Sequence, residues 1–284
     1  MKVNIHRLLK EATDAAPQAE WIGLRRVTNR LTAFSAIDGK FDEAAGGSDE
    51  GVMLEVLYKG TFSYAATADL SSGGIKRAAE QAFAAAQAAQ PYGIHRFDQT
   101  MRPATQVRYA TKREKLSGIP AAETVELLCS ICDAAKVSSK IIQTAASCET
   151  GICETETVST NGADIRQTVR FGGISMNAVA REGDIIQQRS AHGRSALTYQ
   201  GGRELFNPAG LLEKARKAGA EAVELLTAAP CPNGKRTLVL MPDQMMLQIH
   251  ESVGHALEID RILGDERNYA GGSFITPEDI GSFR

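Results

Sequence analysis

"GVMLEVLYKGTFSYAATA", residues 51–68, consists of two runs rich in β-branched and aromatic residues, and the turn signal Lys59-Gly60 separates them. Two earlier runs, "EWIGLRRV" and "RLTAFSAI", have the same character, and Asp38-Gly39 marks a turn after the second of them. Four such runs joined by short turns are typical of strands that pair with their chain neighbours. The sequence therefore predicts a small antiparallel sheet in this part of the chain.

Helical patterns flank this predicted sheet on both sides. Residues 5–16 have helical periodicity, and "GGIKRAAEQAFAAAQAAQ" (residues 73–90) places its apolar residues on one face of a helix. Pro91 and Gly93 are typical of residues that end such a helix. We expect residues 1–100 to form an N-terminal α+β domain.

The same order of elements is predicted again for residues 111–229, after an irregular passage at 91–110. A helix begins near Pro120, and another begins at Asn207-Pro208, with proline at its first position, and runs to about residue 226. Asn161-Gly162 is a two-residue hairpin signal between strands. The predicted strands are "KIIQTAASCE", "ICETETVST", "ADIRQTVRF", "ISMNAVAR" and "DIIQQRSA".

A third region is expected at residues 235–284. The preceding segment "AAPCPNGKR" has two prolines and a glycine, which is typical of a domain boundary. Beyond it, "RTLVLM" predicts a short buried strand, Pro242 and Asp243 begin a helix, and the glycine-rich end predicts a long loop. The predicted fold class is α+β, with helix and antiparallel strand meander units followed by the start of a C-terminal domain.

The composition of the 284-residue chain excludes several classes of protein. Its formal net charge is −2 and its basic residues are scattered, which argues against a nucleic-acid-binding surface. No apolar run is long enough to cross a membrane, and the N-terminus lacks the pattern of a secretory signal. The five cysteines are an odd number, which does not indicate a disulfide framework. We therefore expect a cytoplasmic protein with no nucleic-acid or membrane partner.

The segment "QIHESVGHALEID" (residues 248–260) contains His250, Glu251 and His255. A metallopeptidase helix usually spaces its two histidines four residues apart, so that both rings leave the same face. At a spacing of five, the two rings would be about 140° apart around a regular helix. A one-residue π-bulge near Ser252 and Gly254 would reduce this angle to about 40°, and such bulges tend to occur at functional sites. The spacing therefore predicts a distorted helix that binds a metal ion.

A catalytic zinc ion usually has three protein ligands, so two histidines are too few. Glu258 is one candidate for an additional ligand or a supporting residue, and Asp260 and Asp265 are others. If the bulge follows Glu251, this glutamate can accept a proton from water that zinc has activated.

Cysteines 129 and 132 form a C-x-x-C pair, which can also bind zinc. No second such pair is present, and both thiols share the apolar face of their helix with Val125 and Leu128. This placement favours a role in the core.

An alternative interpretation of the histidine motif needs no metal. In it, His250 lies at a helix interface, His255 packs as a neutral core histidine, and Gly254 allows close helix packing. We expect His95 and His192 to be exposed or hydrogen-bonded rather than to act as ligands. The chain has neither a dinucleotide-binding nor a P-loop motif, and no second E-x-x-H set that a dinuclear oxidase would require.

Residues 240–283, "LMPDQMMLQIHESVGHALEIDRILGDERNYAGGSFITPEDIGSF", resemble the metal-binding segment of the TldD/PmbA metallopeptidase family, on the TldD side that carries H-E-x-x-x-H. The resemblance implies that His250 and His255 are zinc ligands and that Glu251 is the catalytic acid/base. It also implies cytoplasmic cleavage of unfolded or extended peptides by a homodimer, or by a heterodimer with a related PmbA/TldE-type subunit.

The chain departs from the family pattern at one point. The C-terminal domain of the family continues beyond this segment and supplies a cysteine as the third zinc ligand, whereas Cys231 precedes the motif here. We therefore expect a C-terminally truncated member that binds zinc weakly and hydrolyses little by itself. The alternative is a catalytically inactive chain that acts as an interaction or assembly module.

Overall fold

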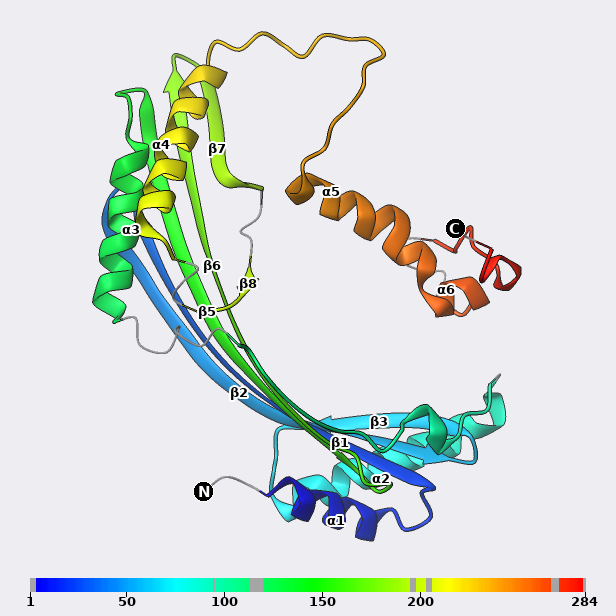
Figure 1. Cartoon of the computed structure of the whole chain (residues 1–284). Helices are drawn as coiled ribbons and strands as arrows, with labels where there is room; N and C mark the ends of the chain where they lie inside the picture. Colours follow the sequence, from blue (N-terminus) through cyan, green and yellow to red (C-terminus); the bar gives the residue numbers. More distant parts are fainter. Residues whose placement is uncertain are drawn as a thin grey trace.

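The computed structural model describes residues 4–93, 95–112, 120–194, 198–202, 206–266 and 271–282. Its fold is α+β, as predicted, and it is built on a strongly curved sheet (Figure 1). The strands of this sheet are β1 (Trp21–Ile37), β2 (Lys40–Tyr58), β3 (Thr61–Thr67), β4 (Gln106–Ala110), β5 (Ile141–Ser159), β6 (Asp164–Glu182), β7 (Ile185–Arg194) and β8 (Tyr199–Gln200).

Within the described residues, the strand order is β3-β2-β1-β5-β6-β4, and β7 and β8 also pair with β6. Every pairing is antiparallel except that of β4, which runs parallel to β6. Residues 91–110 are predicted to be irregular, and this prediction is wrong at β4. The segment alternates polar residues with Val107 and Tyr109, but this pattern covers only the five residues of β4, all of them exposed, and the partner strand β6 is distant in the sequence.

The sheet is continuous where the sequence predicts separate strands. β1 is a single strand of 17 residues, and β5 and β6 have 19 residues each. The prediction broke these strands at residues that are common in turns, among them Gly151. In the structure Gly151 pairs with Phe171, and a Cβ at Gly151 would lie 2.2 Å from the Phe171 ring. This glycine therefore makes room for an aromatic ring within the sheet.

The two predicted repeats contribute to one sheet, because β1 pairs with β5 along most of its length. The strands of residues 21–67 and those of residues 141–182 thus form a single surface. The predicted boundaries at residues 100, 111, 229 and 235 stay predictions.

The predicted helices are confirmed, and those ends that the sequence predicts lie within one or two residues of the observed ones. They are α1 (Ile5–Ala15), α2 (Ser72–Ala89), α3 (Ala121–Ala135) and α4 (Pro208–Leu225). The side chains of Asn4 and Ser71 accept hydrogen bonds from backbone amides in the first turns of α1 and α2, which explains where these helices begin. Short 3-10 helices lie at Gln90–Tyr92, Gln99–Met101 and Pro277–Asp279.

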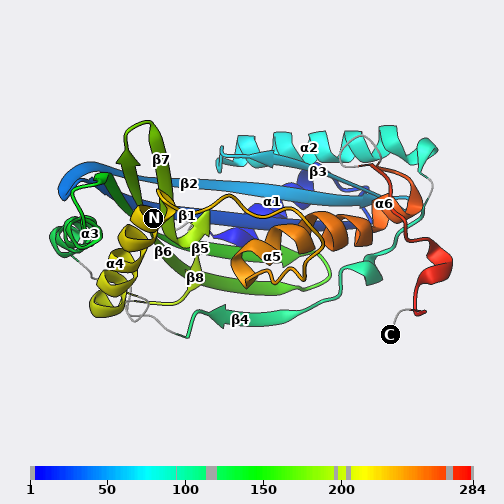
Figure 2. The ribbon, with the colours of Figure 1, turned by 90° about the horizontal axis from the view of Figure 1, so that it is seen from above.

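Two hydrophobic clusters lie at opposite ends of the same face of the sheet. The first packs α1 and α2 against residues that include Ile22 and Leu24 of β1, and the second packs α3 and α4 against residues that include Ala36. These three residues share one side of β1 because side chains alternate along a strand. The four helices therefore cover the outer face of the curve, and α5 (Pro242–Ile249) and α6 (Ile259–Leu263) lie on its inner side (Figures 1 and 2).

The strand predicted at residues 236–241 is wrong. These residues have no regular secondary structure, and the side chains of Leu238 and Val239 are 76% and 79% exposed. A strand is stable only when a neighbour accepts its backbone hydrogen bonds, and no described strand pairs with this segment. The described residues also contain no helix that is long and apolar enough to cross a membrane.

Helices α3 and α4 approach each other closely at Gly219 in α4. A Cβ at this position would lie 2.1 Å from the carbonyl oxygen of Ala135, the last residue of α3. A backbone atom is not free to rotate away as a side chain is, so an alanine here must push the two helices apart.

We predict that Gly219→Ala makes the protein less stable than the control Gly210→Ala by about 1–3 kcal/mol, the usual cost of overpacking. Gly210 is in the same helix, where an added Cβ would meet only the flexible side chain of Asn207. Both variants exchange glycine for alanine in α4, so their difference isolates the steric cost. Urea denaturation measures it, and equal stabilities for the two variants would contradict the close approach.

Candidate metal centre

The helix that carries the histidine motif begins at Pro242, with proline at its first position as predicted. The amides of Gln244 and Met245 donate to the carbonyl of Met241, at 3.0 and 2.8 Å, and close the first turn. The helix α5 then continues in α-helical form to Ile249, directly before the first histidine of the motif.

At His250 the helix widens into a π turn that extends to Gly254. The amide of His255 donates to the carbonyl of His250, five residues earlier. This turn contains the extra residue that the spacing of the histidines requires, and the predicted bulge is therefore present. A Cβ at Gly254 would meet only the carbonyl oxygen of Ile249, at 3.6 Å, so the structure does not use this glycine for close helix packing.

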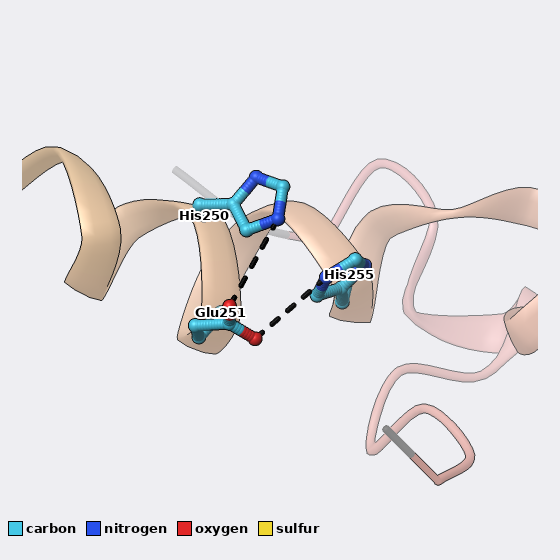
Figure 3. A group of neighbouring side chains, drawn as sticks. All are labelled: His250, Glu251 and His255. Atoms are coloured by element: carbon cyan, nitrogen blue, oxygen red, sulfur yellow. Dashed lines mark ion pairs between the residues drawn. The ribbon is translucent and has the colours of Figure 1, made fainter. Parts of the chain in front are cut away.

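The π turn brings His250, Glu251 and His255 together (Figure 3). The centroids of the two imidazole rings are 4.5 Å apart, and one potential ligand atom from each of the three residues lies within 4.8 Å of the others. The carboxylate of Glu251 lies between the rings, with its oxygens 4.0 Å from Nε2 of His250 and 3.7 Å from Nε2 of His255. Within the described residues, this is the only such group that could hold a metal ion.

The two histidines differ in exposure. The side chain of His250 is 64% exposed, whereas that of His255 is 16% exposed. An exposed His250 is not packed at a helix interface within the described residues. The structure therefore does not support the part of the metal-free interpretation that places His250 at such an interface. His255, the more buried ring, is held by further contacts.

Glu258 provides the first of these contacts, since its carboxylate oxygen lies 3.1 Å from Nδ1 of His255. Arg261 forms an ion pair and a hydrogen bond with the other oxygen of Glu258. Arg261 is itself buried, and its guanidinium donates to the carbonyl of Gly271 at 2.7 Å. The hydrogen bond from Arg261 lowers the pKa of Glu258, and His255 lowers it further. The carboxylate of Glu258 is therefore ionised at neutral pH.

The segment after the motif folds back onto it. The hydroxyl of Ser273 donates to the carbonyl of Ala256 at 2.6 Å, and the backbone of Ile275 donates to the same hydroxyl at 2.9 Å. Gly264 adopts a left-handed conformation, with φ of 84°, and ends α6. This segment is predicted to be only a long loop, but its described residues support the end of the helix that carries the histidine motif.

The other candidate ligands lie elsewhere. Asp260 accepts a hydrogen bond from the amide of Arg261 at 2.8 Å, and neither Asp260 nor Asp265 belongs to the group of three. Cys132 is buried, and its thiol donates to the carbonyl of Ala36 at 3.4 Å, while the half-buried Cys129 packs against the same core; this agrees with the core role favoured above. The ring of His95 lies tilted beside that of Phe97, with centroids 6.4 Å apart, and the side chain of His192 lies outside the described residues.

The donor set suits a zinc-type ion. Imidazole nitrogens are typical ligands of divalent transition metals, and those of His250 and His255 would each lie about 2.0–2.1 Å from zinc. The potential ligand atoms of the group lie within 4.8 Å of one another, which is slightly farther apart than the ligands of one ion would lie. Rotation of the exposed ring of His250 can reduce this separation. The role of these residues as ligands stays a prediction, but their geometry is compatible with it.

Comparison with known families finds two domains of a metallopeptidase family in this chain. Residues 24–86 match the family description "PmbA/TldA metallopeptidase domain 1", and residues 114–226 match "PmbA/TldA metallopeptidase central domain". The chain belongs to the PmbA/TldD family. Both matched ranges end before the histidine motif.

Two curated relatives are named metalloproteases, a name that implies a metal cofactor. The chain is 28% identical over 266 residues to a metalloprotease of Methanothermobacter thermautotrophicus, a match that covers 93% of this chain and 56% of the relative. It is 25% identical over 232 residues to a metalloprotease of Methanocaldococcus jannaschii, which covers 81% of this chain and 49% of the relative. The chain thus spans about half the length of these relatives.

Solved structures share the fold. A protein of Bacteroides thetaiotaomicron described as a candidate modulator of DNA gyrase superposes with a TM-score of 0.73 at 14% identity, over 93% of this chain and 60% of that chain. A similarly described protein of Thermotoga maritima gives a TM-score of 0.62 at 14% identity, over 81% and 50%. TldE from Thermococcus kodakarensis gives 0.50 at 13% identity, over 75% and 46%.

We predict that burial sets the order in which two thiols of this chain react, with Cys231 before Cys148. Cys231 is exposed, whereas burial raises the pKa of Cys148 to about 11, and the neutral thiol is a poor nucleophile. Alkylation with iodoacetamide at pH 8, followed by peptide mass mapping, measures the order. Cys148 should react only after denaturation, and labelling of Cys148 as fast as Cys231 would contradict its placement in the core.

Proposed function

We propose that this protein is a zinc-dependent peptidase of the TldD type that hydrolyses unfolded or extended peptides. The observation that carries the proposal is the π turn at residues 250–254, which places the two histidines beside each other with Glu251 between them. The family membership and the names of the curated relatives support a metallopeptidase, and the donor set supports zinc.

Each residue of the group has a distinct proposed role. His250 and His255 bind the ion through Nε2, the nitrogen that each ring presents toward Glu251. A zinc ion held there supplies a Lewis acid that acidifies water and polarises the carbonyl of a peptide bond. Glu251 accepts the proton from water and transfers it to the departing amine. Its exposed carboxylate is placed on the side of the helix that both rings share.

The proposed setting of this activity is the cytoplasm. All five cysteines are free, which is typical of proteins in a reducing compartment. The proposed assembly is a homodimer, or a heterodimer with a related PmbA/TldE-type subunit. Exposed apolar side chains on and beside the motif helix support association, because large exposed apolar surfaces commonly mark interfaces. These side chains are Leu247, Ile249, Val253, Leu257 and Ile259.

The same exposed apolar residues favour a second candidate function, an interaction or assembly module without catalytic activity. The two functions differ in their need for metal. A module needs no stoichiometric zinc, whereas the peptidase requires zinc at the histidine pair.

We predict that the chain binds one zinc ion, and that His250→Ala and His255→Ala each weaken zinc binding by more than about a hundredfold. The loss of a ligand should cost more affinity than the loss of a residue that only supports a ligand. His95→Ala is the control, because His95 lies outside the group. Competition against a chromophoric chelator measures the affinities. Binding that is equal in all four proteins would contradict the site and favour the assembly module.

We predict that Glu251→Gln retains zinc but loses metal-dependent cleavage of an unfolded peptide, by about a hundredfold or more, because the amide does not accept the proton. The assay uses a labelled casein-type peptide with and without the chelator, together with the proposed partner subunit if the chain alone is slow. Cleavage by Glu251→Gln at the rate of the unmodified protein would contradict the proposed role of the glutamate.

A further inference from the structure

Glu258 contacts the ring of His255 at the nitrogen that does not face Glu251. The two nitrogens of this ring point in different directions: Nε2 lies 3.7 Å from Glu251, and Nδ1 lies 3.1 Å from Glu258. Glu258 was considered above as an additional ligand, but a carboxylate at Nδ1 is on the wrong side of the ring to share a metal ion with Nε2. Its contact instead determines how the ring is oriented.

A carboxylate only accepts hydrogen bonds, so its contact with Nδ1 requires the proton of the neutral imidazole to be on Nδ1. The lone pair is then on Nε2, which is the form of histidine that binds a metal through that nitrogen. Histidines that bind metals usually donate their other ring N–H to a carboxylate or a carbonyl, and such partners fix both the tautomer and the orientation of the ring.

Glu258 is held in place in turn. It follows a short 3-10 helix, His255–Leu257, and its own backbone is extended, with φ of −67° and ψ of 125°. Arg261 binds its second oxygen and is anchored to the carbonyl of Gly271. The guanidinium is buried, so it occupies a defined position rather than sampling solvent. A chain of contacts thus runs from Gly271 through Arg261 and Glu258 to Nδ1 of His255.

We propose that Glu258, supported by Arg261, is a positioning residue that keeps His255 in the Nδ1–H tautomer with Nε2 directed toward the metal position. This inference rests on the proposed function, since it assigns a partner to one of the proposed ligands. It goes beyond that function by giving Glu258 a role separate from that of a ligand or of the proton acceptor Glu251.

The test compares the 284-residue chain with Glu258→Ala, Glu258→Gln and the control Glu278→Gln, which changes an exposed glutamate elsewhere in the same region. The first measurement is the tautomer of His255 without metal, from ring ¹⁵N chemical shifts in histidine-labelled protein. The pH is 8.5, about two units above the ordinary pKa of imidazole. Loss of one set of signals in His255→Ala assigns the ring.

The expected tautomer is Nδ1–H in the unmodified protein and in the control. Glu258→Ala should shift the ring toward Nε2–H, and Glu258→Gln should largely retain Nδ1–H, because its amide oxygen still accepts a hydrogen bond. This rescue separates positioning from general loss of structure. An unchanged tautomer in Glu258→Ala would overturn the proposal.

The second measurement is zinc affinity by chelator competition. Glu258→Ala should bind zinc about tenfold to a hundredfold more weakly than the unmodified protein, and Glu258→Gln should lie between the two. A changed tautomer with unchanged affinity would overturn the link to the metal. Failure of the proposed function is distinct: the unmodified protein would then show no zinc binding that depends on His250, whatever the tautomer of His255.

Discussion

One backbone hydrogen bond, from the amide of His255 to the carbonyl of His250, determines the geometry of the site. In a regular α-helix this amide would bond to Glu251, four residues earlier, and His255 would be rotated by about 100° away from its present direction. The wider π turn accommodates one extra residue and returns both rings to the same side, 4.5 Å apart. The ligand group exists only because the helix departs from regular geometry at this point.

The supports of this turn are local. The segment downstream bonds back to it through Ser273 and Ala256, and Arg261 connects Glu258 to Gly271. The sheet contributes in a different way, because both helix pairs cover its outer face and α5 and α6 lie on the inner side. The arrangement separates the hydrophobic cores, which stabilise the sheet, from the motif helix, which carries the proposed chemistry.

Much of this architecture could be predicted from the sequence, and the errors have physical causes. Helical spacing located α1 to α4, and the histidine spacing predicted the π turn because a shared metal ion demands it. The long strands were divided at residues such as Gly151, whose purpose, room for Phe171, depends on a partner strand. The strand expected at 236–241 was wrong because an apolar run does not reveal the absence of a pairing neighbour. The role of Glu258 was left open, since it depends on which ring nitrogen the carboxylate meets.

The central claim is that His250 and His255 share one metal ion across the π turn. X-ray absorption spectroscopy at the zinc edge, on the zinc-loaded 284-residue chain, tests it most directly. The account predicts two imidazole nitrogens at about 2.0–2.1 Å with the remaining ligands oxygen. A spectrum without the signature of two imidazoles, or one dominated by sulfur at about 2.3 Å, would contradict it and place the ion at the cysteines instead.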